Sequence, residues 1–200
     1  AVGLKTALAC LNEARFGIGW GCLGAAGDCF ETAREYVLQR KQFNDRPIAS
    51  HQLVQGELAW MASEISKAQL LAHHIAKLKS QGRLHHSQIS MLKRNNAWMA
   101  LEVARRCRDL LGANGITEDY PIFRHMANLE TVKTYEGTDN IHALVIGERL
   151  LPRAAPEVVR VAAEGRQWAW RFSYEDAPER ETENLLHIPA GRPFDVAIAT

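Results

Sequence analysis

The chain has 200 residues, of which 46% are hydrophobic, and 24 Lys and Arg against 23 Asp and Glu give a formal net charge of +1. This length suffices for one sizeable domain plus an appendage. A near-zero charge excludes a whole-chain field that would attract nucleic acid or anionic lipid, so neither is an expected partner. The apolar runs are far shorter than the ~20 residues that span a bilayer, and no basic-then-apolar leader opens the chain. We therefore expect an unexported, cytoplasmic protein.

The first predicted helix is long. Apolar residues return to one face from Leu4 through Trp20 to Val37 at spacings of three, four and seven. Five glycines at 17, 19, 21, 24 and 27 would weaken an exposed helix, so they indicate close approach of another backbone or a ligand, with tight packing as the alternative. Four widely spaced cysteines (Cys10, Cys22, Cys29 and Cys107) predict buried free thiols, without a metal site or a disulfide framework.

Two more long helices follow. Pro47 is expected to open the second after the polar turn 44–46, and its apolar face continues to Gly82. Histidine doublets at 73–74 and 85–86 flank residues 80–82; they are interpreted as a solvated connection, because adjacent helical residues point about 100° apart and do not share a metal. The third helix ends at residues 112–115, where Gly and Asn favour a left-handed stop.

The fourth helical stretch is interrupted. Tyr120-Pro121 begins a short helix, residues 135–138 break it at Gly137, and an apolar helical face resumes from Ile141 to Leu150. The fold class is thus mainly α, an antiparallel four-helix bundle over residues 1–151, and the break places Glu136 near a helix N-terminus.

Composition changes at Pro152, and residues 152–200 form a short β-rich tail. Residues 158–161 and 168–172 alternate as strands do, and 189–191 would join 185–188 to 194–198 as a hairpin turn. Such a sheet would leave bare edges, so the tail is interpreted as an incomplete domain.

Glu136 is the candidate for chemistry. A carboxylate at a helix break, between Tyr135 and Gly137, can be shielded from water yet reachable by a ligand, and desolvation makes a carboxylate a better acceptor for a weakly acidic carbon-bound proton. From the residues alone, an acid stabilised by the helix dipole explains Glu136 as well.

The stretch TYEGTDNIHAL at 134–144 resembles the catalytic-base motif of acyl-CoA dehydrogenases, nearest the glutaryl-CoA dehydrogenase branch. Three further segments match the same family in order: LNEARFGI at 11–18, RKQF at 40–43 and RDLLGANGI at 108–116. The resemblance covers residues 1–151 and implies the C-terminal helical domain of a FAD-dependent oxidoreductase of fatty acid or amino acid catabolism. It implies that Glu136 takes the α proton of an acyl-CoA while the β hydride passes to the flavin, and that the backbone N–H of Glu136 binds the thioester oxygen.

The resemblance assigns further roles. Arg40, Gln42 and Phe43 match the segment that reaches the FAD of a neighbouring subunit, although Asn44 stands where the family usually has glycine; an ordinary helix end is the alternative. Asp109, Gly112 and Ala113 match the segment that packs on the adenosine, with Ala113 in place of a common glycine and a simple helix C-cap as the alternative. Polar contacts to FAD are implied for Thr138 and Asn140, and substrate contacts for Asn12, Arg15, Tyr135 and Gly137. A surface arginine beside Glu13 is the alternative for Arg15.

Partners implied by the resemblance are an acyl-CoA substrate, electron-transfer flavoprotein as acceptor, and further copies of the chain in a dimer or tetramer; the location would be the mitochondrial matrix in a eukaryote. The family's N-terminal helical and middle β domains, which hold much of the flavin, are not in this sequence. A non-catalytic helical oligomerisation module is therefore the rival hypothesis.

Residues 157–200 resemble the start of the cupredoxin domain of cytochrome c oxidase subunit II, in which Trp168 would lie near the electron entry point. No Cys follows Cys107, so the copper site of that family cannot form. A packed strand face is the alternative for Trp168 and Trp170. Two partial domains in one chain suggest a fusion, an assembly error or an engineered join near Pro152.

Overall fold

The computed structural model describes residues 3–151, 159–166, 169–187 and 194–199. The chain divides into two compact units, Ala1–Arg149 and Leu150–Thr200. The first is helical and the second is a small β-sheet, so the expectation of a mainly α chain with a β-rich C-terminal segment is confirmed.

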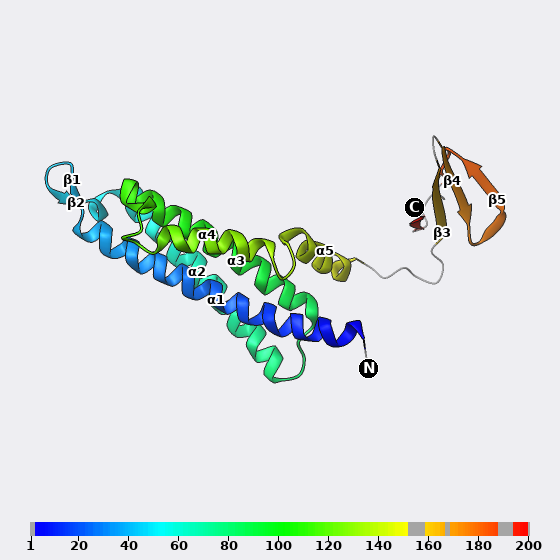
Figure 1. Ribbon diagram of the computed structural model, residues 1–200, viewed down its shortest axis with the longest axis horizontal. Helices are drawn as coiled ribbons and strands as arrows, with labels where there is room; N and C mark the ends of the chain where they lie inside the picture. Colours follow the sequence, from blue (N-terminus) through cyan, green and yellow to red (C-terminus); the bar gives the residue numbers. More distant parts are fainter. Residues whose placement is uncertain (1–2, 152–158, 167–168, 188–193, 200) are drawn as a thin grey trace. The chain divides into compact units, whose positions relative to one another are not determined.

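Four helices build the body of the first unit: α1 (Leu4–Gln39), α2 (Gln52–Ser80), α3 (His86–Leu111) and α4 (Ile122–Thr134). Figure 1 shows them side by side, with successive helices running in opposite directions. Helix α3 packs against α1, α2 and α4 and carries more of the described buried side chains than any other helix, among them Leu92, Leu101 and Val103. The predicted antiparallel bundle is therefore confirmed, with α3 at its centre.

The connection between α1 and α2 differs from the prediction. The chain turns through a hairpin of β1 (Lys41–Gln42) and β2 (Arg46–Pro47), and a 3-10 turn at Ile48–Ser50 precedes α2. Pro47 therefore does not open the second helix, as was expected. Ile48 is buried and its N–H donates to the carbonyl of Arg40 at 2.8 Å, which ties this segment to the end of α1 before a helix can begin.

The ends of α3 follow its sequence signals. The His85 ring accepts a hydrogen bond from the N–H of Ser87, and the Gln88 side chain accepts one from the N–H of His85, as in a capping box. Residues 81–83, 85 and 86 are exposed, which confirms a solvated connection there. Gly112 has φ +58 and ends the helix, and a 3-10 helix at Gly112–Ile116 follows.

The four cysteines of the chain and the glycines of α1 are only partly as expected. All four cysteines are free; Cys22, Cys29 and Cys107 are buried, but Cys10 is exposed because it lies on an outward face near the start of α1. Tight packing explains one glycine: a Cβ on Gly19 would lie 2.6 Å from Cγ of Leu92. Open space adjoins Gly17, Gly21, Gly24 and Gly27.

The second unit is a four-stranded sheet in the order β5-β4-β3-β6, made of β3 (Val159–Arg166), β4 (Ala169–Tyr174), β5 (Ala177–Glu183) and β6 (Phe194–Ala199). The predicted hairpin between 185–188 and 194–198 is wrong. Residues 185–187 form no strand, and β6 instead pairs in parallel with β3, Val161 opposite Val196. The predicted turn at 189–191 and Ile188 lie outside the described residues, as does Trp168.

A small core holds this sheet. Val159, Val161 and Tyr174 are buried, with Phe172 and Leu186 partly buried against them. Trp170 is 44% exposed, so it does not belong to this buried group. No helix of the described residues is long and apolar enough to cross a membrane.

Candidate functional site

The break between α4 and α5 (Asp139–Leu150) has an unusual backbone. Glu136 has φ +55 and Gly137 has φ +92, so two successive residues adopt left-handed or related conformations. Glycine tolerates this at little cost, whereas a residue with a side chain, such as Glu136, seldom does so unless its surroundings hold it there. The segment is therefore held in this conformation by contacts with other helices.

Two cationic side chains bind three consecutive carbonyls of the break. Arg15 on α1 donates from Nε to the carbonyl of Glu136 at 2.8 Å. Lys93 on α3 donates from Nζ to the carbonyls of Tyr135 at 2.9 Å and Gly137 at 2.7 Å. Residues far apart in the sequence thus fix the backbone on both sides of the carboxylate.

Lys93 was not among the residues singled out from the sequence. It is 1% exposed, and burial, which penalises the ammonium, lowers the pKa of Lys93 from its usual value; the nearby charges act in both directions. The sequence signal that could have pointed to Lys93 is the spacing of three between the polar residues of α3, which the structure shows to be buried: Ser87, Ser90, Lys93 and Asn96. Asn96 also donates from Nδ2 to the carbonyl of Gly19 at 2.9 Å, so this buried stripe joins α3 to α1.

The carboxylate of Glu136 is half-buried and free. Its Oε2 atom is buried and has no hydrogen-bond partner among the described residues. No ion pair of Glu136 is found in the described part of the chain either. A carboxylate in that state can accept a proton or hydrogen bond from a bound molecule.

His142 lies directly behind the break. Its ring is fully buried, and neither ring nitrogen has a hydrogen-bond partner among the described residues. Desolvation, with the nearby charges of Lys93 and Arg15, lowers the pKa of His142 to about 4, so the ring is neutral at pH 7. A Cβ on Gly137 would lie 2.9 Å from Nε2 and Cε1 of this ring, so only glycine fits at that position.

Four other predicted site residues lie at the break, at the start of α5 or on α1. Thr138 accepts from the N–H of Ile141 through Oγ1 at 3.3 Å, and Asn140 is exposed in the first turn of α5. Tyr135 is 45% exposed, and Asn12 is half-buried one turn before Arg15 on α1.

Arg15 is not the surface arginine that the alternative interpretation proposed. Glu13 pairs instead with Lys79 at 2.5 Å, and the Lys79 ammonium also lies 5.3 Å from the centroid of the Phe16 ring. Arg15 is thereby left to bind the carbonyl of Glu136 from the other side of α1.

Five of the six residues predicted to contact FAD at the other end of α1 line one pocket. Arg40 and Gln42, from the end of α1 and β1, line a cavity of about 350 Å³ together with Asp109, Gly112 and Ala113 from the end of α3. Asp109 also pairs with its neighbour Arg108. Tyr36, Ile48, Leu110, Leu111 and Asn114 complete the lining.

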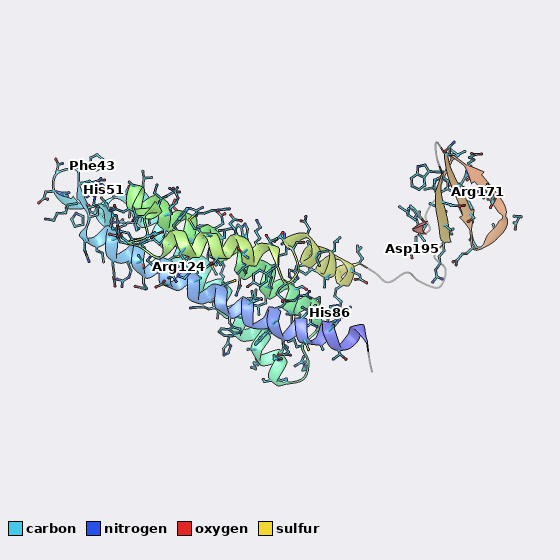
Figure 2. The ribbon with its side chains drawn as sticks, viewed as in Figure 1. Phe43, His51, His86, Arg124, Arg171 and Asp195 are labelled. Atoms are coloured by element: carbon cyan, nitrogen blue, oxygen red, sulfur yellow. The ribbon has the colours of Figure 1, made fainter. Side chains whose placement is uncertain are left out.

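Phe43 does not line this pocket. It is 74% exposed in the hairpin turn, and its ring meets the edge of the His51 ring at a centroid distance of 5.6 Å. Figure 2 shows Phe43 and His51 together at the hairpin end of the bundle. Positive φ values at Phe43, Asn44 and Asp45 form that turn without the glycine that the family usually has.

The residues around Glu136 and those of the pocket at Arg40 lie far apart within the chain. Arg15 and Arg40 are 25 residues apart along α1, which at 1.5 Å per residue is about 37 Å. The carboxylate and the pocket therefore cannot form one compact site within a single copy of the bundle.

Comparison with known proteins identifies the fold and the family. The sequence model described as "Acyl-CoA dehydrogenase, C-terminal domain" matches residues 1–151. The short/branched chain specific acyl-CoA dehydrogenase of Bos taurus, a mitochondrial protein, is 34% identical over 146 residues, covering 73% of this chain and 34% of the relative. The match ends before the tail, and the cupredoxin resemblance of residues 157–200 is not borne out.

Two structures of glutaryl-CoA dehydrogenase from Mycobacterium smegmatis are also similar. One is 50% identical, and the other, in complex with FADH2, is 47% identical; each has a TM-score of 0.74 and covers 78% of this chain and 40% of its own. The chain thus spans about a third of the length of the curated relative that it matches. With its bundle, its helix break and the four sequence segments in family order, the chain belongs to the acyl-CoA dehydrogenase family, of which residues 1–151 are the C-terminal domain.

Proposed function

We propose that residues 1–151 supply the base and part of the flavin site of a FAD-dependent acyl-CoA dehydrogenase, with Glu136 as the group that removes the α proton. The observation that carries the proposal is the buried Oε2 of Glu136, which has no partner among the described residues. The N–H groups of Glu136 and Gly137 also have no acceptor among those residues. A free acceptor beside free donors suits a thioester whose α proton must leave while negative charge develops on its oxygen.

The residues of the 350 Å³ pocket fit part of a dinucleotide. A guanidinium from Arg40 suits a phosphate, and the polar groups of Gln42, Asn114 and Tyr36 suit ribose hydroxyls or phosphate oxygens. Gly112 and Ala113 leave room for a flat ring above the end of α3. FAD, when bound, would supply the acceptor for the hydride from the β carbon.

This chain's residues would then perform three tasks. Glu136 takes the α proton on its carboxylate, and its backbone N–H holds the thioester oxygen. Arg15 and Asn12 lie on the same stretch of α1 beside the break and are proposed to contact the CoA side of the substrate, next to Tyr135 and Gly137. Thr138 and Asn140 are proposed to add polar contacts to FAD.

We further propose that the two groups serve different flavins. The ~37 Å between Arg15 and Arg40 along α1 supports a homo-oligomer, in which the pocket of one copy completes the flavin site of another. Electron-transfer flavoprotein is the proposed acceptor. The similarity to a mitochondrial protein and to two bacterial structures supports a matrix or cytoplasmic location.

The substrate class that we propose is a short acyl-CoA of the glutaryl-CoA type. The identity of 50% to a glutaryl-CoA dehydrogenase supports it, against 34% to the short/branched chain relative. Selectivity would be measured as the relative extent to which glutaryl-CoA and 2-methylbutyryl-CoA reduce bound flavin.

The test compares the chain with its Glu136→Gln variant after reconstitution with FAD. In preparations of either protein that contain flavin, acyl-CoA should bleach the visible absorbance of the wild type alone, because an amide cannot accept the α proton. Glu148→Gln, at an exposed position on α5, is the matched control and should bleach like the wild type. Bleaching by Glu136→Gln would contradict the proposal. A chain that oligomerises but never retains flavin would favour the non-catalytic assembly module.

A further inference from the structure

The strained segment at Glu136 needs a support that the sequence motif itself does not contain. Positive φ at Glu136 is costly for a residue with a side chain, and the segment lies between two short helices. No backbone hydrogen bond of the described residues involves the carbonyls of Tyr135, Glu136 or Gly137. Side chains alone therefore satisfy these three acceptors.

Lys93 provides two of the three hydrogen bonds. Its Nζ lies 2.9 Å from the carbonyl oxygen of Tyr135 and 2.7 Å from that of Gly137, so one ammonium bridges the residues on both sides of Glu136. The ammonium is buried and faces no carboxylate at ion-pair distance among the described residues. Charge-assisted hydrogen bonds of this kind are roughly twice as strong as neutral ones.

The surroundings explain why a lysine performs this task. Helix α3 is the central helix, and Lys93 lies on its buried stripe between Ser90 and Asn96. Asp139, at the start of α5, pairs instead with Arg94 on the exposed side of α3 at 3.2 Å. Lys93 thus binds the backbone of the break, while its neighbour Arg94 binds the first residue of α5.

We propose that Lys93 is the positioning residue of the Glu136 segment: by binding the carbonyls of Tyr135 and Gly137 it holds them toward α3 and leaves the N–H and carboxylate of Glu136 without a partner, available to a ligand. The role in positioning a base rests on the proposed function above, whereas the bridge itself does not. Lys93 acts through the backbone and not through contact with the substrate.

Amide hydrogen exchange in the full chain tests the bridge at two reporters. The N–H of Tyr135 donates to the carbonyl of Thr131 at 3.0 Å, and that of His142 donates to Thr138 at 3.1 Å, so the reporters lie on either side of the break. Lys93→Met keeps length and apolar volume but removes the ammonium. We expect both amides to exchange at least about tenfold faster, because the variant loses at least one charge-assisted hydrogen bond. The exchange rates of the amides of α1 and α2 should not change.

Two variants separate the bridge from general packing. Lys93→Arg keeps a cation at the same place and should rescue part of the protection. Lys133→Met removes a half-buried lysine of α4, two residues before Tyr135, that has no hydrogen bond among the described residues, and should leave both reporters unchanged. Unchanged exchange in Lys93→Met, or an equal increase in Lys133→Met, would overturn the proposal.

A measurement on the wild type covers the case in which Lys93→Met does not fold. The Lys93 ammonium protons should exchange with solvent much more slowly than those of exposed Lys77, as seen by nitrogen-detected NMR. Equal rates would refute the bridge. In protein that retains flavin, Lys93→Met should slow the bleaching of the flavin absorbance by acyl-CoA without changing the affinity for flavin. If the exchange effect is present but flavin never binds, the bridge stands and the proposed function falls.

Discussion

His142 is a buried neutral imidazole next to two cations, so its protonation in acid should lower the stability of the folded chain. Because its folded pKa of about 4 lies below the unfolded value of 6.5, the unfolded chain binds a proton first as the pH falls. The contribution of His142 to stability is therefore complete above about pH 6.5 and is lost as the pH falls to about 4, up to about 3 kcal/mol in total.

Urea unfolding across this pH window tests the prediction. The free energy of unfolding of the wild type should fall more steeply between pH 6.5 and 4 than that of His142→Gln, which cannot titrate. His74→Gln, at an exposed position on α2, should retain the wild-type slope. Parallel curves for the wild type and His142→Gln would show that the buried ring does not control the acid limit.

The sequence predicted the residues of the break that carry a motif, and it missed those that act through tertiary contact. Glu136, Gly137 and Arg15 were singled out, and the structure brings Arg15 onto the backbone of Glu136. Lys93 and His142 were not, because burial of a lone lysine or histidine depends on which helix faces close around it. The resemblance placed Phe43 with Arg40 and Gln42 at the FAD, yet Phe43 lies exposed in a turn of three positive φ values and does not line the pocket.

At the scale of elements, the packing of α1 on α3 depends on one glycine among five. Gly19→Ala would place its Cβ 2.6 Å from Cγ of buried Leu92, so it should destabilise the chain by about 1–3 kcal/mol. Gly21→Ala meets open space and should stabilise it by up to about 1 kcal/mol through helix propensity. Urea denaturation of the two variants measures the difference, and equal effects of the same sign would contradict this account of the α1–α3 contact.

Elements with a strong helical period were predictable, and those defined by pairing were not. Apolar spacing located α1 to α4, and Gly112 marked the end of α3. The hairpin β1–β2 has two residues in each strand, too few for a period to appear. Strand β5 reads APERETE, with Pro178 and four charged residues, a composition that suits an edge strand and carries little β signal. The parallel pairing of β6 with β3 needed the whole sheet to be known.

At the scale of the whole chain, the bundle and the sheet have separate cores. The bundle core draws on α1 to α4, whereas the described residues of the sheet bury only Val159, Val161, Ala163 and Tyr174, with a few partly buried neighbours. A β unit with so few buried side chains is marginal by itself, because little apolar surface offsets its conformational entropy. We therefore expect the two units to unfold independently, the sheet at the lower denaturant concentration.

Truncation after residue 151 tests this independence. Because no core residue of the bundle comes from the described part of the sheet, the 1–151 chain should keep the helical circular dichroism of the full chain and its urea midpoint for the helical transition. The β transition of the full chain should disappear with the segment. A lower helical midpoint in the 1–151 chain would mean that the sheet stabilises the bundle, and the two units would then have to be treated as one cooperative fold.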